Sequence, residues 1–179
     1  MARYKAVAIG GVPATGKSTL MKQIISTKGT KSLTSWKYGL VNGYLLDDVC
    51  VIGTYPADET FGGTDRLSMA SPVDMMKFMD FNKYSFIFEG DRLFTKKILT
   101  KASKLFDLKI IILEQSDETL KERHILRGDT QSEKFLKGRK TKIQNIKEDE
   151  AVKDLIQLYT LEDYKDTDHL TKEIISYLW

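Results

Sequence analysis

Short apolar runs alternate along the chain with longer stretches in which apolar residues recur at helical spacing. The apolar runs have the length of buried strands and lie at 5–11, 84–92, 108–114 and 154–159. The amphipathic stretches predict helices at 16–27, 71–81, 94–106, 117–128 and 166–179. Strands that alternate with helices in this way predict an α/β fold with a mostly parallel sheet covered on both faces.

The segment 36–56 departs from this alternation, because it has a strand-like pattern and no helical one. Asn42 and Gly43 form a pair that is typical of hairpin turns, and Asp47 and Asp48 mark a second turn. We therefore predict a β-hairpin insertion on the α/β plan.

Two serines mark predicted helix starts. Ser71 is followed by Pro72, the usual order of a cap and a first helical residue, and Ser116 precedes the helix at 117–128. The glycine-rich, polar segment 58–70 before Ser71 predicts a loop.

Composition narrows the class of protein. The 179 residues suffice for one compact domain spanning 1–179, and 41% apolar with 30% charged residues describes an ordinary globular chain. The single cysteine, Cys50, excludes an intrachain disulfide and is expected to be a small buried apolar residue. No apolar run approaches the ~20 residues that a membrane helix needs, so we predict no membrane partner and a cytoplasmic, reduced protein.

The sequence from 11 to 18 fits the pattern G-x-x-x-x-G-K-[ST] between a predicted strand and a predicted helix. Its glycines let the backbone bend so that N–H groups face a phosphate, and the helix start adds its dipole. Lys17 is expected to reach the β- and γ-phosphates of ATP, and the Ser18 hydroxyl to bind Mg²⁺. The predicted nucleotide-binding residues are Gly11, Ala14, Thr15, Gly16, Lys17, Ser18 and Thr19.

The end of the strand at 84–92 distinguishes between classes of nucleotide-binding protein. A GTPase switch would carry N-K-x-D, but 82–85 lacks the aspartate, and a motor ATPase would usually have a longer chain. Instead Glu89, Asp91 and Arg92 end the strand, a pattern typical of small kinases. There a carboxylate orients Mg²⁺ or accepts a hydroxyl proton, and an arginine binds the acceptor. The predicted metal-binding residues are Ser18, Glu89 and Asp91.

Cations gather in the segment 123–147, where small kinases carry a lid. Arg123 and Arg127 are four apart, so they share one face of a helix and would serve the transferred phosphoryl group. The alternative is that they are solvated helix charges. Between Lys121 and Lys147 nine Lys or Arg residues stand against three acidic ones, an excess of six that exceeds the net charge of +3 of the whole chain.

The loop 61–68 is the predicted acceptor site. Asp65 is a candidate general base and Arg66 a candidate anchor for a phosphate or a base, and two glycines would let the backbone approach a ligand. Asp65, Glu89 and Asp91 compete for the role of base. We favour Asp65, with Glu89 or Asp91 near the metal.

These motifs together carry a family resemblance. The chain resembles the small phage-encoded P-loop kinases that phosphorylate 5-hydroxymethyluracil in DNA, through the strings GVPATGKST, FGGTDRLSMA, FEGDRLF, LRGD and FLKGRKTKIQNI. The resemblance implies a three-layer P-loop kinase fold with a hairpin insertion at about 36–56 and a basic lid at about 123–147. It also implies ATP and Mg²⁺ as cofactors, the hydroxymethyl oxygen of the base as acceptor, and the cytoplasm of the host cell as location.

A base within a duplex must be flipped into the pocket, which requires backbone contacts and stacking surfaces. The residues predicted to contact DNA phosphates are Lys134, Lys137, Arg139, Lys140 and Lys142. Trp36, Tyr38 and Tyr44 are candidates for stacking, with core packing as the alternative. Two other functions remain open: a deoxynucleoside or nucleoside-monophosphate kinase, and a nucleotide-binding DNA adaptor without transfer activity.

Overall fold

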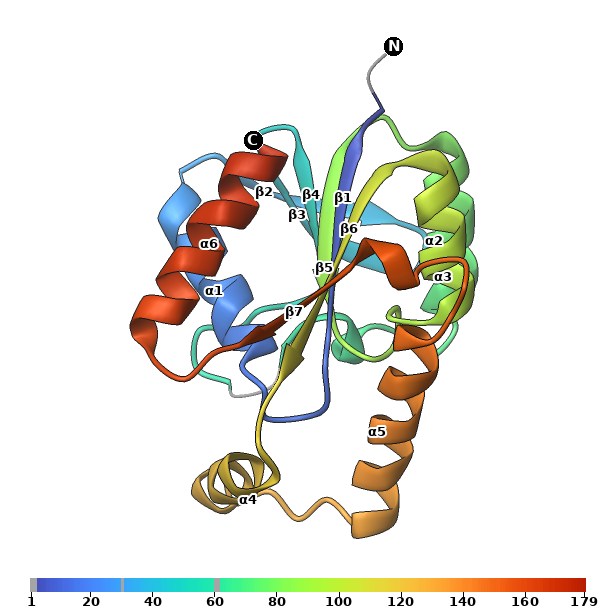
Figure 1. The fold of residues 1–179 in the computed structure, drawn as a ribbon. Helices are drawn as coiled ribbons and strands as arrows, with labels where there is room; N and C mark the ends of the chain where they lie inside the picture. Colours follow the sequence, from blue (N-terminus) through green and yellow to red (C-terminus); the bar gives the residue numbers. More distant parts are fainter. Residues whose placement is uncertain (1–2, 30, 60–61) are drawn as a thin grey trace.

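The computed structural model describes residues 3–29, 31–59 and 62–179. Within these residues one sheet has the strand order β2-β3-β4-β5-β1-β6-β7 (Figure 1). The strands are β1 (Lys5–Gly10), β2 (Leu33–Tyr38), β3 (Val41–Leu46), β4 (Val49–Ile52), β5 (Ser85–Glu89), β6 (Asp107–Glu114) and β7 (Ile156–Thr160). The helices are α1 (Lys17–Lys28), α2 (Ser71–Phe81), α3 (Lys96–Leu105), α4 (Asp117–Leu126), α5 (Glu133–Lys147) and α6 (Tyr164–Leu178), with 3₁₀ turns at Thr64–Arg66 and Lys153–Leu155.

The parallel part of the sheet runs from β4 to β7, with β1 at its centre. β1 pairs in parallel with β5 on one side and β6 on the other, β4 adds to β5, and β7 adds to β6. The carboxyl ends of these strands therefore meet at one edge of the sheet, where ligands bind in open α/β sheets. The prediction of an α/β fold with a mostly parallel sheet is confirmed.

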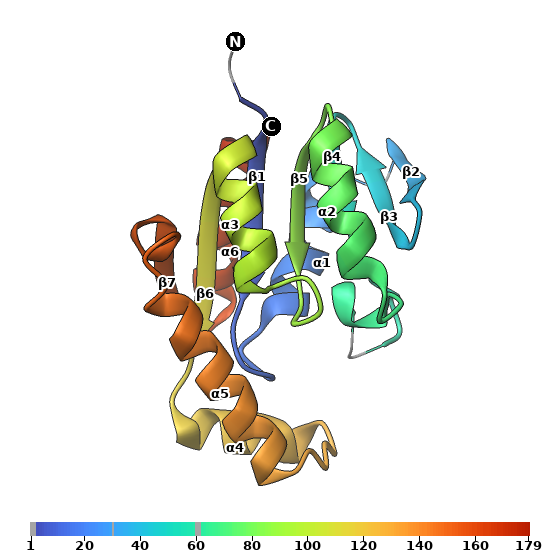
Figure 2. The same ribbon diagram turned by 90° about the vertical axis from the view of Figure 1, so that its right-hand side faces the viewer.

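Helices cover both faces of this sheet. Figures 1 and 2 show α1 and α6 on one face and α2 and α3 on the other, with α4 and α5 projecting beyond the carboxyl edge. Ala6 and Ala8 of β1 face the apolar cluster on the α2–α3 side, whereas Val7 and Ile9 face the cluster on the α1–α6 side. All four side chains are fully buried, as expected for a central strand in a parallel sheet.

The first hairpin turn lies three residues before the predicted one. Gly39 and Leu40 join β2 to β3, and Gly39 takes a φ of +58° that favours glycine. Asn42 and Gly43, predicted to be the turn, lie inside β3. Gly43 is needed there because a Cβ atom would come within 2.0 Å of the Val51 carbonyl oxygen on the neighbouring strand. The second predicted turn, at 47–48, is confirmed.

The predicted insertion is correspondingly smaller than 36–56. Only β2 and β3 form the antiparallel extension, because β4 pairs in parallel with β5 and belongs to the main sheet. The rings of Trp36 and Tyr38 pack against Phe78 of α2, with centroids 4.9 and 5.8 Å away, and Tyr44 packs on the opposite face. Core packing thus accounts for these three aromatic residues.

The two serines differ as helix caps. Ser116 caps α4, since its hydroxyl accepts a hydrogen bond from the Thr119 amide at 3.1 Å. The predicted Ser71 cap is wrong. The Ser71 amide already bonds to the Ser68 carbonyl, so Ser71 enters α2 as a helical residue with Ala70 at the cap position, and its buried hydroxyl has no partner among the described residues.

Two further features are the burial of Cys50 and the length and hydrophobicity of the helices. Cys50 is fully buried in β4, which confirms the prediction of a small buried residue, and burial raises the pKa of its thiol to about 12. In the parts of the chain that the structure describes, no helix is both long and apolar enough to span a membrane.

Candidate functional site

A cavity of about 670 Å³ opens at the carboxyl edge of the sheet. Its walls come from the loop after β1, the segment before α2, the loop after β5, and the segment from the end of α4 into α5. Most of the predicted site residues line it, namely Gly11, Ala14, Gly16, Lys17, Ser18, Asp65, Arg66, Glu89, Asp91, Arg92, Arg127, Arg139 and Lys142. The remaining ones lie outside its walls: Thr15, Thr19, Arg123, Lys134, Lys137 and Lys140.

The loop between β1 and α1 has the strained backbone of an anion-binding turn. Gly11, Ala14 and Gly16 have φ values of +143°, +70° and +101°. A Cβ at Gly11 would come within 2.5 Å of the Leu113 carbonyl oxygen, so only glycine fits there. Buried Thr15 stabilises the loop from within by donating to the Val12 carbonyl at 2.9 Å. Ala14 is a non-glycine residue at positive φ, a strain that the sequence pattern did not predict.

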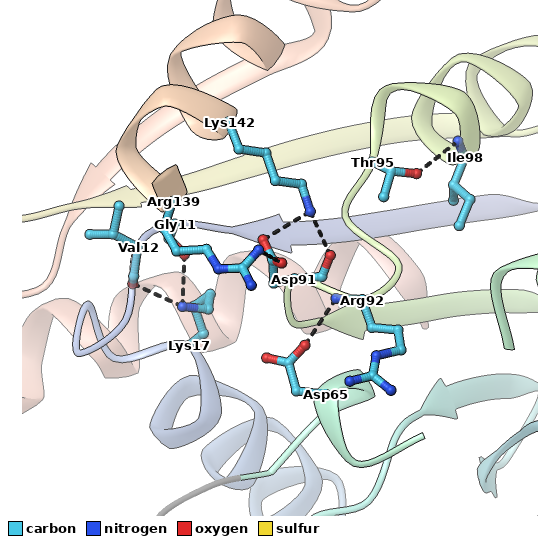
Figure 3. Close-up of polar contacts among 10 residues, drawn as sticks. All are labelled: Gly11, Val12, Lys17, Asp65, Asp91, Arg92, Thr95, Ile98, Arg139 and Lys142. Atoms are coloured by element: carbon cyan, nitrogen blue, oxygen red, sulfur yellow. Dashed lines mark hydrogen bonds and ion pairs between the residues drawn. The ribbon is translucent and has the colours of Figure 1, made fainter. Parts of the chain in front are cut away.

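No side chain caps α1, whose N-cap is Gly16. The amides of its first turn are therefore available to an anion at the helix N-terminus. Lys17, the first residue of α1, turns back over the loop and donates to the carbonyl oxygens of Gly11 and Val12, both at 2.9 Å (Figure 3). Its ammonium group is thus held over the loop, where an anion bound by the loop would contact it.

Burial and the charges around the cavity both shift the pKa of Lys17. Burial is the largest influence on the pKa of Lys17 and lowers it, and the charge of Arg127 lowers it further. The carboxylates of Glu89, Asp65 and Asp91 act in the opposite direction. The three carboxylates, two at the end of β5 and one in the segment before α2, are therefore close enough to interact electrostatically with this lysine.

Glu89 at the end of β5 is only 1% exposed. Burial raises the pKa of its carboxyl to about 7, although the Lys17 charge and the hydrogen bond from Ser18 favour the ionised form. The Ser18 hydroxyl donates to Glu89 Oε1 at 2.9 Å. Gly63, predicted to let the backbone approach a ligand, packs instead against this carboxylate, since a Cβ there would come within 2.2 Å of Oε1.

Ser18 and Glu89 fit a magnesium ion in their chemistry. Among the described residues no three His, Cys, Asp or Glu side chains gather as a metal site. Mg²⁺, however, needs only one or two protein oxygens when substrate phosphates and water complete its shell. A hydroxyl oxygen and a carboxylate oxygen 2.9 Å apart at the end of the loop form such a pair.

Asp65 and Arg92 both line the cavity and are joined by a hydrogen bond. Asp65 Oδ1 accepts a hydrogen bond from the Arg92 amide at 2.9 Å (Figure 3). The Arg92 guanidinium donates to the Leu67 carbonyl at 2.5 Å. The acceptor loop is thereby tied to the end of β5. Arg66 lines the same cavity and forms an ion pair with Glu59.

The two predicted lid arginines have different environments. Arg123 in the last turn of α4 donates to the carbonyl oxygens of Ala14 and Leu161, at 3.0 and 2.9 Å. Arg123 therefore links the end of α4 to the glycine-rich loop and to the segment that follows β7. Arg127, the residue that ends α4, lines the cavity, and burial is the largest influence that lowers its pKa.

The basic stretch forms α5, and the five cations that were predicted to contact DNA fall into three groups. Arg139 and Lys142 reach into the cavity and pair with Asp91, whereas Lys140 pairs with Asp117 of α4 outside it. The remaining two, Lys134 and Lys137, are exposed and have no ion pair within the described chain. Sequence reasoning assigned all five to one DNA-binding surface and did not foresee this division.

Some residues of the cavity wall were missed altogether. Phe135 lies one turn before Arg139, and the Arg139 guanidinium sits over its ring at 4.5 Å. The spacing of four residues was the available signal for this contact. Met69 and Pro72, just before and within the start of α2, add apolar surface to the same wall.

No protein-family model matches the chain, and no curated protein matches it in sequence. The site is therefore defined by its own geometry: a strained glycine-rich turn, a hydroxyl–carboxylate pair and converging cations at the carboxyl edge of a parallel sheet.

Proposed function

We propose that the chain is an ATP- and Mg²⁺-dependent P-loop kinase that transfers the γ-phosphate to the hydroxymethyl group of 5-hydroxymethyluracil in DNA. The observation that carries the proposal is that one cavity joins the loop that holds Lys17 and Ser18 to an exposed carboxylate, Asp65, on a different loop. A donor site and an acceptor site that share one cavity are what phosphoryl transfer requires.

At the donor end, the amides of the loop and of the first turn of α1 would bind the phosphates, and Lys17 would exchange its two carbonyl contacts for phosphate oxygens. Ser18 and Glu89 would hold Mg²⁺, which when bound neutralises the phosphate oxygens. Six cationic and three acidic side chains line the cavity, and this positive surplus suits a polyanionic ligand.

At the acceptor end, Asp65 is the best-placed base. Glu89 is hydrogen-bonded to Ser18 and Asp91 is paired with two cations, whereas Asp65 Oδ2 makes no hydrogen bond within the described residues. In the proposed step the acceptor oxygen attacks the γ-phosphorus and gives its proton to Asp65. The bond from that phosphorus to the β–γ bridging oxygen breaks, and ADP leaves with the electron pair.

The DNA acceptor is favoured by the family resemblance and by two features of the site. The apolar wall of Met69, Pro72 and Phe135 suits a flat base. The exposed cations Lys134 and Lys137, on the same helix as Phe135, suit a phosphate backbone. The rival acceptor is a free nucleoside or nucleotide.

One experiment distinguishes these possibilities. The protein is incubated with γ-labelled ATP and one of three acceptors: a duplex that contains 5-hydroxymethyluracil, an unmodified duplex, or free nucleosides and nucleotides. We expect label only on the modified duplex, and none with Lys17→Met. Label confined to the free compounds would replace the DNA acceptor by the rival, and ATP binding without any transfer would favour an adaptor.

A further inference from the structure

Asp91 forms ion pairs with two cationic side chains of α5. Arg139 pairs with its Oδ2, and Lys142 donates to its Oδ1 at 2.9 Å and to its backbone carbonyl at 2.7 Å. Figure 3 shows both side chains descending from α5 onto this one aspartate. From the sequence, Asp91 was predicted to bind a metal ion, and Arg139 and Lys142 were predicted to contact DNA phosphates. A carboxylate whose two oxygens already hold an arginine and a lysine is poorly suited to a divalent cation.

The N-terminal part of α5 has few other contacts with the body of the protein. Ile143, which packs on the core, and Lys147, which pairs with Glu114, lie in the C-terminal part of α5. Of its residues only Ile146 is buried, near its C-terminal end. Figures 1 and 2 show the N-terminal part of the helix projecting from the sheet toward α4. The other ion pair from this half, Lys140 with Asp117, is largely exposed, and such pairs contribute little. The contacts at Asp91 are more protected, since these side chains are about 30% exposed.

The contacts at Asp91 also lie beside the donor site. Asp91, Arg139 and Lys142 line the cavity together with Lys17 and Ser18, and the charge of Asp91 reaches Lys17. By contrast Arg123, one of the two cations expected to serve the phosphoryl group, binds loop carbonyls outside the cavity. A different pair of cations therefore faces the place where negative charge would develop during transfer.

We propose that Asp91 is a positioning residue that holds Arg139 and Lys142 in the cavity, where these two cations bind the phosphoryl group in transfer. Asp91 is then not a ligand of Mg²⁺. The inference rests on the proposed kinase function for the role of the two cations, but the positioning by Asp91 can be measured without it.

The first measurement uses the unliganded protein. Hydrogen exchange of the α5 amides is compared in the wild type, Asp91→Asn and Asp117→Asn. Asparagine keeps the shape of the aspartate and removes its charge. We expect exchange across residues 139–147 to be several-fold faster in Asp91→Asn, and unchanged in Asp117→Asn, which removes only the exposed pair on the same helix. Unchanged exchange in Asp91→Asn would overturn the inference.

The second measurement uses phosphoryl transfer. Asp91→Asn and Arg139→Gln should each lower kcat by roughly tenfold to a hundredfold, because each weakens the same charge stabilisation. The KM for ATP and the Mg²⁺ concentration at half-maximal rate should stay near wild-type values. Adding Asp91→Asn to the double variant Arg139→Gln/Lys142→Gln should slow transfer no further, since Asp91 acts through these two cations. Asp91→Glu should recover part of the rate, and Asp117→Asn should retain all of it.

The outcomes separate the two proposals. A raised Mg²⁺ requirement in Asp91→Asn with wild-type exchange would make Asp91 a metal ligand and overturn the inference. A further loss when Asp91→Asn is added to Arg139→Gln/Lys142→Gln would overturn it too. If the wild type transfers no phosphate to any acceptor, the proposed function fails and the role of the two cations in transfer fails with it. The exchange measurement then still decides whether Asp91 positions α5.

Discussion

Replacing Glu89 with glutamine should stabilise the unliganded protein at pH 8 and leave its stability nearly unchanged near pH 4.5. The carboxyl is 1% exposed, and burial raises its pKa from 4.5 to about 7. Each pKa unit corresponds to about 1.4 kcal/mol, so an ionised Glu89 lowers the free energy of unfolding by about 3 kcal/mol. That figure already contains the favourable effects of Lys17 and Ser18 on the charged form.

The direction of the pH dependence follows from the pKa of Glu89, which is lower in the unfolded chain than in the folded protein. Below pH 4.5 the carboxyl is protonated in both the folded and the unfolded protein, and it imposes no penalty. Between pH 4.5 and about 7 the unfolded chain releases the proton and the folded protein still holds it, so stability is lost as the pH rises. Glutamine resembles the protonated acid in shape and does not titrate, and its amide oxygen can still accept the Ser18 hydrogen bond.

Urea unfolding of the wild type and Glu89→Gln, followed at several pH values from 5 to 8 without Mg²⁺, measures the difference directly. The stability advantage of Glu89→Gln should grow with pH and level off above pH 7, at about 3 kcal/mol. Glu122→Gln, which changes an exposed glutamate of α4, is the control and should follow the wild type. Parallel pH profiles for the wild type and Glu89→Gln would refute the claim that burial holds a proton on Glu89.

Three further predictions concern catalysis, DNA binding and reactivity. Asp65→Asn should lower kcat by about 10²–10⁴-fold while the dissociation constant for ATP, measured by calorimetry, stays unchanged; a wild-type rate would remove Asp65 as the base. Lys134→Gln and Lys137→Gln should each weaken binding to duplex DNA and reduce the slope of log K against log salt by about one, and an unchanged slope would place these exposed lysines away from the DNA. Because Cys50 is fully buried and burial raises the pKa of its thiol to about 12, a thiol reagent at pH 8 should label it only after unfolding in urea; rapid labelling of the native protein would contradict this.

Local sequence was informative for the glycine-rich loop and for the Ser116 cap, whose determining contacts lie within a few residues, although the Ser71 cap was predicted wrongly. The glycine-rich loop and the start of α1 occupy residues 11–18. Their conformation could be predicted because the backbone of such a turn requires glycine at two positions. The Ser116 cap could also be predicted from the local sequence, since its hydroxyl accepts a hydrogen bond from an amide three residues away. The hairpin turn was not, because Gly43 serves the close approach of β4 and not a turn.

The sequence by itself therefore determined the α/β alternation, the glycine-rich loop between β1 and α1, and the set of charged side chains at strand ends. Only the tertiary structure decided which of those charges meet. Asp91 and Arg139 are 48 residues apart, and Glu89 has its perturbed pKa because the fold buries it beside Ser18, 71 residues away. The physical reason is range: turns and caps depend on neighbouring backbone atoms, whereas burial and ion pairing depend on packing between elements that are far apart in the chain.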